Sequence, residues 1–217
     1  MRPLSFALAC LLFLGTVTTT VAQRKIIPPT DFNPCPIPEG GCSEPWSGLQ
    51  VMSFPVTCGS TTCMITVYFK CRLACVGSAQ PFRDLSIGWF ESESGFLCGA
   101  CMSAIDLMQI AVPLILKSNI SCWPPVIADN CVTTYRVQSA SCFQQYNTSF
   151  VAGEQIPEFY WWTPCSQAGC CISLWQVCNR FNVLIPTQLP GSYSSGSMEC
   201  ANWTLSAPMA TCYKMCQ

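Results

Sequence analysis

Cysteine is the residue that most constrains what this chain can fold into, with 19 in 217 residues. Residues Met1–Ala22 have the pattern of a secretory signal peptide, because Arg2 precedes an apolar stretch and cleavage after Ala22 satisfies the small-residue rule. One cysteine, Cys10, lies in that segment, so an even set of 18 remains. We expect an exported chain of this kind to be held together by disulfide bonds formed in an oxidising compartment.

The remaining cysteines run along the whole chain, and their spacing leaves the connectivity open. Cys98 and Cys101 form a C-x-x-C sequence, the spacing of a redox dithiol when the first thiolate lies at a helix N-terminus. Close pairs also arise by chance in a cysteine-rich chain, so structural bonds are the favoured interpretation at both positions. The predicted disulfide residues are Cys35, Cys42, Cys58, Cys63, Cys71, Cys75, Cys98, Cys101, Cys122, Cys131, Cys142, Cys165, Cys170, Cys171, Cys178, Cys200, Cys212 and Cys216.

The absence of histidine excludes the commonest catalytic and metal-binding chemistry. A Ser-His-Asp triad lacks its base, and a zinc site of the usual kind lacks imidazole ligands and a second C-x-x-C pair. We therefore expect no catalytic residue, no metal site and no cofactor, and predict that the protein is not an enzyme. Charged residues make up 10% of the chain and the formal net charge is −1, which argues against a nucleic-acid partner.

Residues 23–45 predict an extended arm ahead of a single disulfide-stapled domain at residues 46–217. Six prolines in the arm fix φ and remove backbone donors, which disfavours regular structure. Residues Gln23–Phe32 hold no cysteine, and Ile26 and Ile27 make this part apolar. Such a segment is suited to adding a strand to the sheet edge of a neighbouring copy, so it is the predicted assembly arm.

Alternating apolar residues predict that strands dominate the domain. In the best example, Ile65, Val67 and Phe69 share one face of a half-buried strand. Further strands are expected at residues 49–56, 85–91, 131–143 and 171–181. Apolar residues at spacings of three and four predict one helix near residues 99–117. The predicted fold class is α+β or mainly β, a disulfide-rich antiparallel sheet or sandwich with that helix packed against it.

The apolar run at residues 96–116 has the length of a membrane span, but its content argues against one. Asp106 lies at its centre, where a charged side chain costs about 2.5–3.5 kcal/mol on insertion scales. Pro113 interrupts the run as well and is expected to kink the helix or end it early. We therefore predict a helix packed on the sheet, no transmembrane anchor and a secreted protein.

A dense aromatic run between two prolines is the one pattern that suggests a binding surface. If exposed, it would form a stacking platform for sugars or an apolar docking patch; if buried, it would be core. The run consists of Phe159, Tyr160, Trp161 and Trp162.

Three Asn-X-Ser/Thr sequences predict glycosylation if the source is a eukaryote. They begin at Asn119, Asn147 and Asn202.

Many cysteines, few charges and no catalytic set favour a secreted, disulfide-stapled structural or assembly protein of the extracellular space. A net charge near zero offers little repulsion to self-association, and the N-terminal arm offers a route to polymerisation. The expected partners are copies of the same chain or other extracellular proteins. The alternative is a secreted module that binds carbohydrate or protein through the aromatic run, which would make glycans partners.

Overall fold

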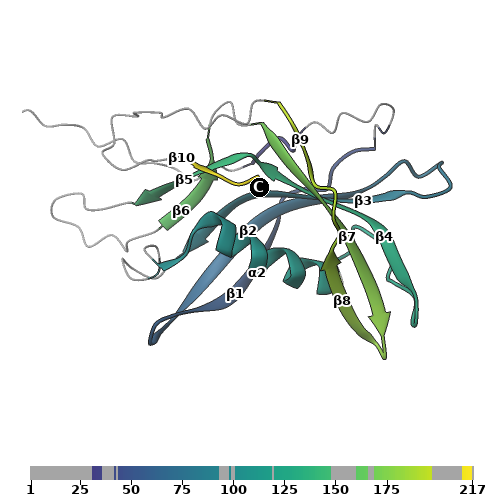
Figure 1. Ribbon diagram of the computed structural model, residues 1–217, viewed down its shortest axis with the longest axis horizontal. Helices are drawn as coiled ribbons and strands as arrows, with labels where there is room; N and C mark the ends of the chain where they lie inside the picture. Colours follow the sequence, from purple (N-terminus) through teal and green to yellow (C-terminus); the bar gives the residue numbers. More distant parts are fainter. Residues whose placement is uncertain are drawn as a thin grey trace, which may run out of the picture.

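The computed structural model describes residues 31–35, 42, 44–92, 98, 101–118, 120–147, 160–165, 169–196 and 212–216. Within them, ten strands form one sheet, and one helix with defined bounds packs against it (Figure 1). The elements are β1 (Gln50–Cys58), β2 (Thr61–Ala74), β3 (Phe82–Ser92), α2 (Ala104–Lys117), β4 (Cys131–Ala140), β5 (Cys142–Asn147), β6 (Tyr160–Pro164), β7 (Cys170–Arg180), β8 (Val183–Gln188), β9 (Tyr193–Ser195) and β10 (Cys212–Lys214). The predicted disulfide-rich sheet with one helix is confirmed.

The sheet is organised around β3. On one side β3 pairs with β2, which runs antiparallel and continues the sheet to β1. On the other side β3 meets two strands in succession: β4, parallel, from Arg83 to Ser86, and β6, antiparallel, from Phe90 to Ser92. Two branches therefore leave β3, one through β4 and β7 to β8 and β9, the other through β6 and β5 to β10. The β3–β4 pair makes the sheet mixed rather than wholly antiparallel.

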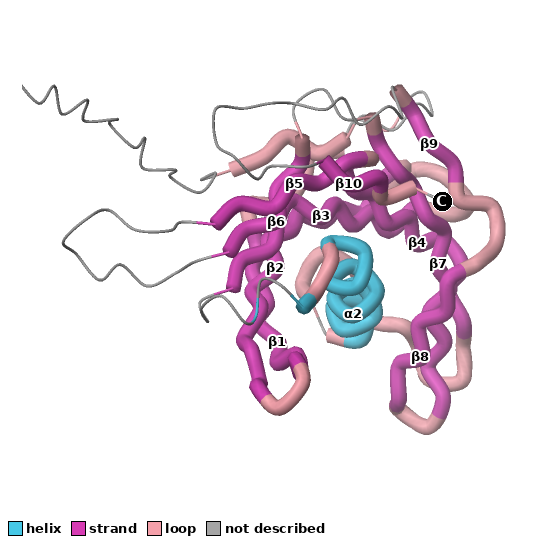
Figure 2. Tube along the Cα trace, turned by 60° about the vertical axis from the view of Figure 1, so that its left-hand side comes forward, coloured by secondary structure: helices cyan, strands magenta, loops and turns pink. Residues whose placement is uncertain are grey.

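The sheet curls around α2, with the β1–β2 hairpin on one side of the helix and the β7–β8 hairpin on the other (Figure 2). The core lies inside this curl. Ile65, Val67 and Phe69 of β2 are buried, as the alternation predicts, and they share one apolar cluster with Leu107 and Ile115 of α2. A single curled sheet closed on a helix thus provides the core that a second sheet would supply in a sandwich.

The helix begins at Ala104, several residues later than predicted, because Ser103 caps it. The Ser103 hydroxyl accepts from the Asp106 N–H at 3.2 Å, and the Asp106 carboxylate accepts from the Ser103 N–H at 3.0 Å, forming a capping box. The Ser103 side chain and N–H together hold the pKa of Asp106 below its ordinary value. The helix does not end at Pro113 but continues to Lys117. Pro113 is part-exposed, and the carbonyl that it leaves without a donor belongs to the exposed residue Gln109.

Disulfide bonds tie irregular segments to the strands. The two C-x-x-C cysteines bond to different residues of the β1–β2 hairpin rather than to each other, so both are structural. The bonds with both partners described are Cys35–Cys170, Cys42–Cys75, Cys58–Cys101, Cys63–Cys98, Cys71–Cys122, Cys131–Cys178 and Cys171–Cys216. Cys142 and Cys165 are disulfide-bonded as well. Cys200 and the side chain of Cys212 lie outside the described part of the chain.

The face of the sheet turned away from α2 is covered in part by residues 31–35. Phe32 packs edge-on against Trp89, with ring centroids 5.9 Å apart, and a Cβ at Gly88 would lie 2.6 Å from the Phe32 ring. Lys70 Nζ donates to the Phe32 carbonyl at 2.8 Å and pairs with Asp31 at 2.7 Å. The end of the predicted assembly arm therefore lies on its own sheet.

Candidate functional site

The aromatic run lies in the interior of the sheet where the structure describes it. Tyr160, Trp161 and Trp162 belong to β6, which is paired on both edges, and all three side chains are buried. Phe159 lies outside the described residues. Three buried side chains do not present the exposed platform that sugar binding would need.

Most other predicted surface residues lie outside the described part of the chain. This holds for Ile26 and Ile27 of the arm, and for Asn119 and Asn202 of the glycosylation sequences. Asn147 is the last residue of β5, and its side chain is not described. Glycosylation and assembly through the arm therefore stay predictions.

A buried charge cluster joins the two sides of β3. The Asp84 carboxylate accepts from Nε of Arg72 on β2 at 2.9 Å and from Nε of Arg136 on β4 at 2.7 Å. Asp84 and Arg136 are buried, and the Arg136 guanidinium stacks on Phe82, 3.8 Å from the ring centroid. A carboxylate held by two cations and closed off from solvent has no access to a substrate, so this cluster has a structural role.

A second buried arginine orients the side chain of Tyr135. Arg83 Nη1 donates to the Tyr135 hydroxyl oxygen at 2.6 Å, and Trp123 packs edge-on against the Tyr135 ring. Burial raises the pKa of Tyr135, although the nearby Arg83 charge opposes the shift. The phenol is therefore neutral near pH 7, and it contributes an apolar ring to the pocket described below.

The β7–β8 hairpin ends in a two-residue turn with an unusual sequence. Phe181 and Asn182 both have positive φ, 52° and 64°. Two such residues define a type I′ turn, which matches the twist of the strands and favours asparagine and glycine. Asn182 suits this conformation, but Phe181 is a bulky residue and is an outlier in it. The left-handed conformation costs an L residue about 1–2 kcal/mol, and strain of this kind gathers at functional positions.

Four large apolar side chains are exposed at this end of the molecule, and we call them the hairpin patch. They are Phe181 (93% exposed), Ile127 (74%), Val183 (60%) and Ile185 (46%). Val183 and Ile185 share one face of β8, while Leu184 between them packs against the core. A hydrogen bond of 2.9 Å from Asn179 Nδ2 to the Val126 carbonyl ties the Ile127 loop to the hairpin.

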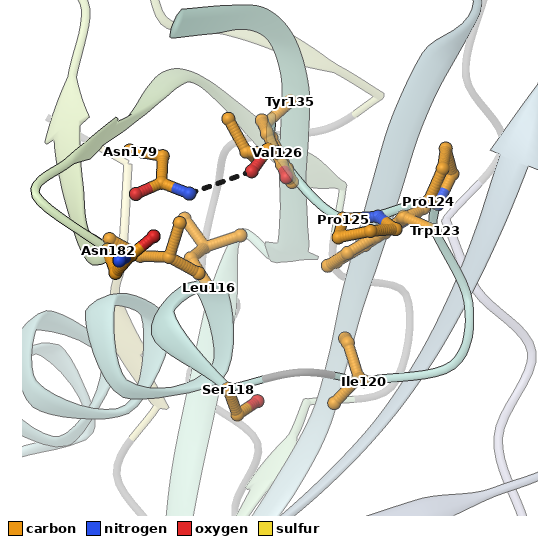
Figure 3. Close-up of a pocket in the computed structure, with 11 residues that line it drawn as sticks. Leu116, Ser118, Ile120, Trp123, Pro124, Pro125, Val126, Tyr135, Asn179 and Asn182 are labelled. Carbon is orange, nitrogen blue, oxygen red and sulfur yellow. Dashed lines mark hydrogen bonds between the residues drawn. The ribbon is translucent and has the colours of Figure 1, made fainter. Parts of the chain in front are cut away.

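A pocket of about 220 Å³ lies on the Leu184 side of the β7–β8 hairpin, the side opposite to Val183 and Ile185, and includes Asn182 of the turn (Figure 3). Its walls come from the C-terminal end of α2, the loop that follows, Tyr135 of β4 and the β7–β8 hairpin. The lining residues are Leu116, Ser118, Ile120, Trp123, Pro124, Pro125, Val126, Tyr135, Asn179, Asn182 and Leu184.

The pocket lining is apolar apart from a few polar side chains, and two of these form hydrogen bonds within the chain. Ser118 Oγ donates to the Ile115 carbonyl at 2.6 Å, and Asn179 Nδ2 donates to Val126. Asn179 Oδ1 is buried without a hydrogen-bond partner. No lining residue is charged. The pocket is therefore suited to an apolar group rather than to a charged metabolite.

The strands at two ends of the described sheet, β1 and β8, each carry a proline. The Leu189 N–H donates to the Leu174 carbonyl directly opposite, so alternation puts Pro186 in a non-hydrogen-bonded pair with its nitrogen on the free edge. The two-residue turn after Cys58 places Pro55 of β1 in the same way. Each proline removes a donor that an added strand would need, so both edges are protected against strand addition.

The sequence patterns do not by themselves single out the hairpin patch. One signal was present: Val183 and Ile185 alternate directly after Phe181-Asn182, which is a hairpin continuation with an asparagine in the turn. The strain and exposure of Phe181 carried no signal, because phenylalanine is not a turn residue. These two properties are visible only in the structure.

Among the described residues, no group of three or more cysteine, aspartate or glutamate side chains is arranged to hold a metal ion. The described residues also contain no helix with the length and apolarity of a membrane span. No protein-family model, curated protein or solved structure matches this chain. Function has to be inferred from the surfaces of the molecule itself.

Proposed function

We propose that this protein is a secreted, non-catalytic structural protein that assembles with copies of itself through the hairpin patch. The observation that carries this proposal is Phe181, which is almost fully exposed and held in a strained backbone conformation. Isolated exposed apolar residues are common, but four at one end of a molecule beside an apolar pocket are typical of an interaction surface.

The disulfide framework supports the extracellular part of the proposal. Bonds of this number persist in oxidising compartments and are rare where thiols are kept reduced. They also stabilise a folded chain whose surface is given to contacts with other molecules, since each bond restricts the unfolded state. A bonded framework of this kind is suited to a long-lived extracellular component.

The hairpin patch fits assembly better than the free strands do. Pro55 and Pro186 obstruct strand addition to β1 and β8, which disfavours that route at these two edges. Side-chain contacts at the hairpin patch need no free backbone donor. A contribution from Ile26 and Ile27 would act in addition to this contact.

A pair of matched double variants tests the proposal. Val183→Thr with Ile185→Thr makes one hairpin polar while keeping residues that favour strands. Val51→Thr with Met64→Thr makes the same change at exposed positions of the β1–β2 hairpin. We expect sedimentation velocity to show concentration-dependent association of the mature protein, weakened by the first change and unaffected by the second.

Two results would overturn the proposal. The first is a mature protein that stays monomeric up to the highest soluble concentration. The second is association that both double variants weaken equally, since a general increase in surface polarity would then explain the loss. Far-ultraviolet circular dichroism of each variant shows whether the fold is kept.

A further inference from the structure

The Phe181 side chain and the pocket beside it have complementary shapes and chemistry. Phe181 projects from the tip of the hairpin with 93% of its surface exposed. The pocket offers about 220 Å³ lined mainly by apolar side chains. An engineered apolar cavity of about 150 Å³ already accepts benzene, so the pocket has room for the phenyl ring of a phenylalanine.

Phe181 and one residue of the pocket lining are neighbours in the chain. Asn182, the second residue of the turn, lines the pocket, and Phe181 directly precedes it. When a projecting group and its receptor lie side by side, a two-fold axis between two copies brings each group to the other's receptor. Such a contact is isologous and closes after two subunits.

The charges around this surface favour the same arrangement. Arg180 adjoins Phe181, Lys117 adjoins the pocket residue Leu116, and Asp129 lies in the loop beside Ile127. All three are exposed, and none forms an ion pair with another of the residues that the structure describes. Both signs of charge therefore border an apolar centre, so a two-fold contact can set Asp129 of one copy against a cation of the other.

From these observations we infer that two copies form a symmetric dimer in which Phe181 of each occupies the pocket of the other. This rests on the proposed function and names the partner and the contact. It also explains why a turn that favours asparagine or glycine holds a phenylalanine. The strain within one chain is offset by apolar burial in the pair.

The test uses one variant that lacks the Phe181 ring and one in which the pocket is filled. Phe181→Asn removes the ring and suits the turn, and Ile120→Trp fills the pocket while leaving Phe181 in place; Leu184→Phe is a second filling variant. We expect each single variant to raise the dimer dissociation constant more than about tenfold, as loss of a central anchor does. An equal mixture of Phe181→Asn and Ile120→Trp keeps one intact contact, so heterodimers should form where neither variant dimerises alone.

Each outcome separates the inference from the proposed function. Wild-type association that Phe181→Asn leaves unchanged overturns the symmetric dimer but not assembly as such. Loss of association in both single variants without heterodimers in the mixture overturns the reciprocal contact. A wild-type chain that never associates overturns both. Native mass spectrometry of the mixture, with one variant isotopically labelled, distinguishes the species.

Discussion

The two hairpins that flank α2 have the same architecture, but their turns differ in sequence. Each has a two-residue turn and is held near its tip by disulfide bonds, Cys58–Cys101 in the β1–β2 hairpin and Cys131–Cys178 in the β7–β8 hairpin. The first turn places glycine, Gly59, at its positive φ of 61°, followed by Ser60. The second places Phe181 at 52°. The first tip follows local conformational preference, and the second departs from it, a difference that the proposed contact between copies would account for.

The largest effect is expected from the cluster that connects the two hairpins through β3. Asp84→Asn leaves the buried Arg136 and the part-buried Arg72 without a carboxylate, and removing one partner of a buried ion pair costs about 3–5 kcal/mol. Chemical denaturation should show this loss, and hydrogen exchange should show both hairpins losing protection together. A loss confined to one hairpin would mean that β3 does not couple the two branches.

The next effect distinguishes the hairpins by their disulfide bonds. Cys63→Ala with Cys98→Ala should lower the free energy of unfolding by about 2–4 kcal/mol and leave self-association unchanged. Cys131→Ala with Cys178→Ala should cost a similar amount and also weaken association, because it loosens the strand that leads to Phe181. Denaturation and sedimentation of the same samples provide both readouts. Equal effects on association would contradict the contrast between the tips.

A smaller effect of opposite sign is expected at the turn itself. Phe181→Gly relieves the left-handed strain, so the monomer should become more stable by about 1 kcal/mol while association is lost. Thermal unfolding at protein concentrations too low for association measures the change in monomer stability.

The reverse change at the other hairpin is the matched control. Gly59→Phe should destabilise the monomer by about 1–2 kcal/mol without creating association, because the pocket that receives Phe181 in the inferred dimer lies beside the other hairpin. A monomer destabilised by Phe181→Gly would show that the phenylalanine packs within its own chain.

The smallest effect is a pH dependence on the β1–β2 side of the sheet. Hydrogen bonds from Lys70 and the Phe32 N–H, in that order, hold the pKa of Asp31 below its ordinary value of 3.8. A lowered folded-state pKa stabilises the protein above the unfolded-state value, and this is lost as the pH falls through the folded value. Asp31→Asn should therefore lower the melting temperature slightly at neutral pH, and the difference should vanish well below about pH 4. A difference that persists in strong acid would assign the effect to packing of Phe32 instead.

The sequence predicts those parts of the fold in which one face alone is buried. The alternation of Ile65, Val67 and Phe69 identifies β2, and apolar spacing identifies α2. In β6, Tyr160, Trp161 and Trp162 are buried on both faces, so no alternation distinguishes a strand from an exposed aromatic run. The parallel contact of β3 with β4 joins distant segments and has no local signal.

The candidate site was beyond sequence reasoning for a related reason. Its pocket is assembled from three segments that become neighbours only when the sheet curls around α2. The strain at Phe181 depends on a backbone angle, which composition does not reveal. By contrast, the capping box of Ser103 and Asp106 is a local motif that is present in the sequence, and it predicts that the helix starts at Ala104.

The Cys35–Cys170 bond, with a sequence separation of 135 residues, has a consequence for how an exported chain is made. If the chain is exported, as we propose, its N-terminal end is delivered first, and Cys35 enters the oxidising compartment before Cys170. During that interval Cys42, Cys58 and other cysteines emerge and offer incorrect partners. The bond that fastens the N-terminal segment across the sheet must therefore close late. Correct maturation then requires a compartment that exchanges disulfides, as well as one that forms them.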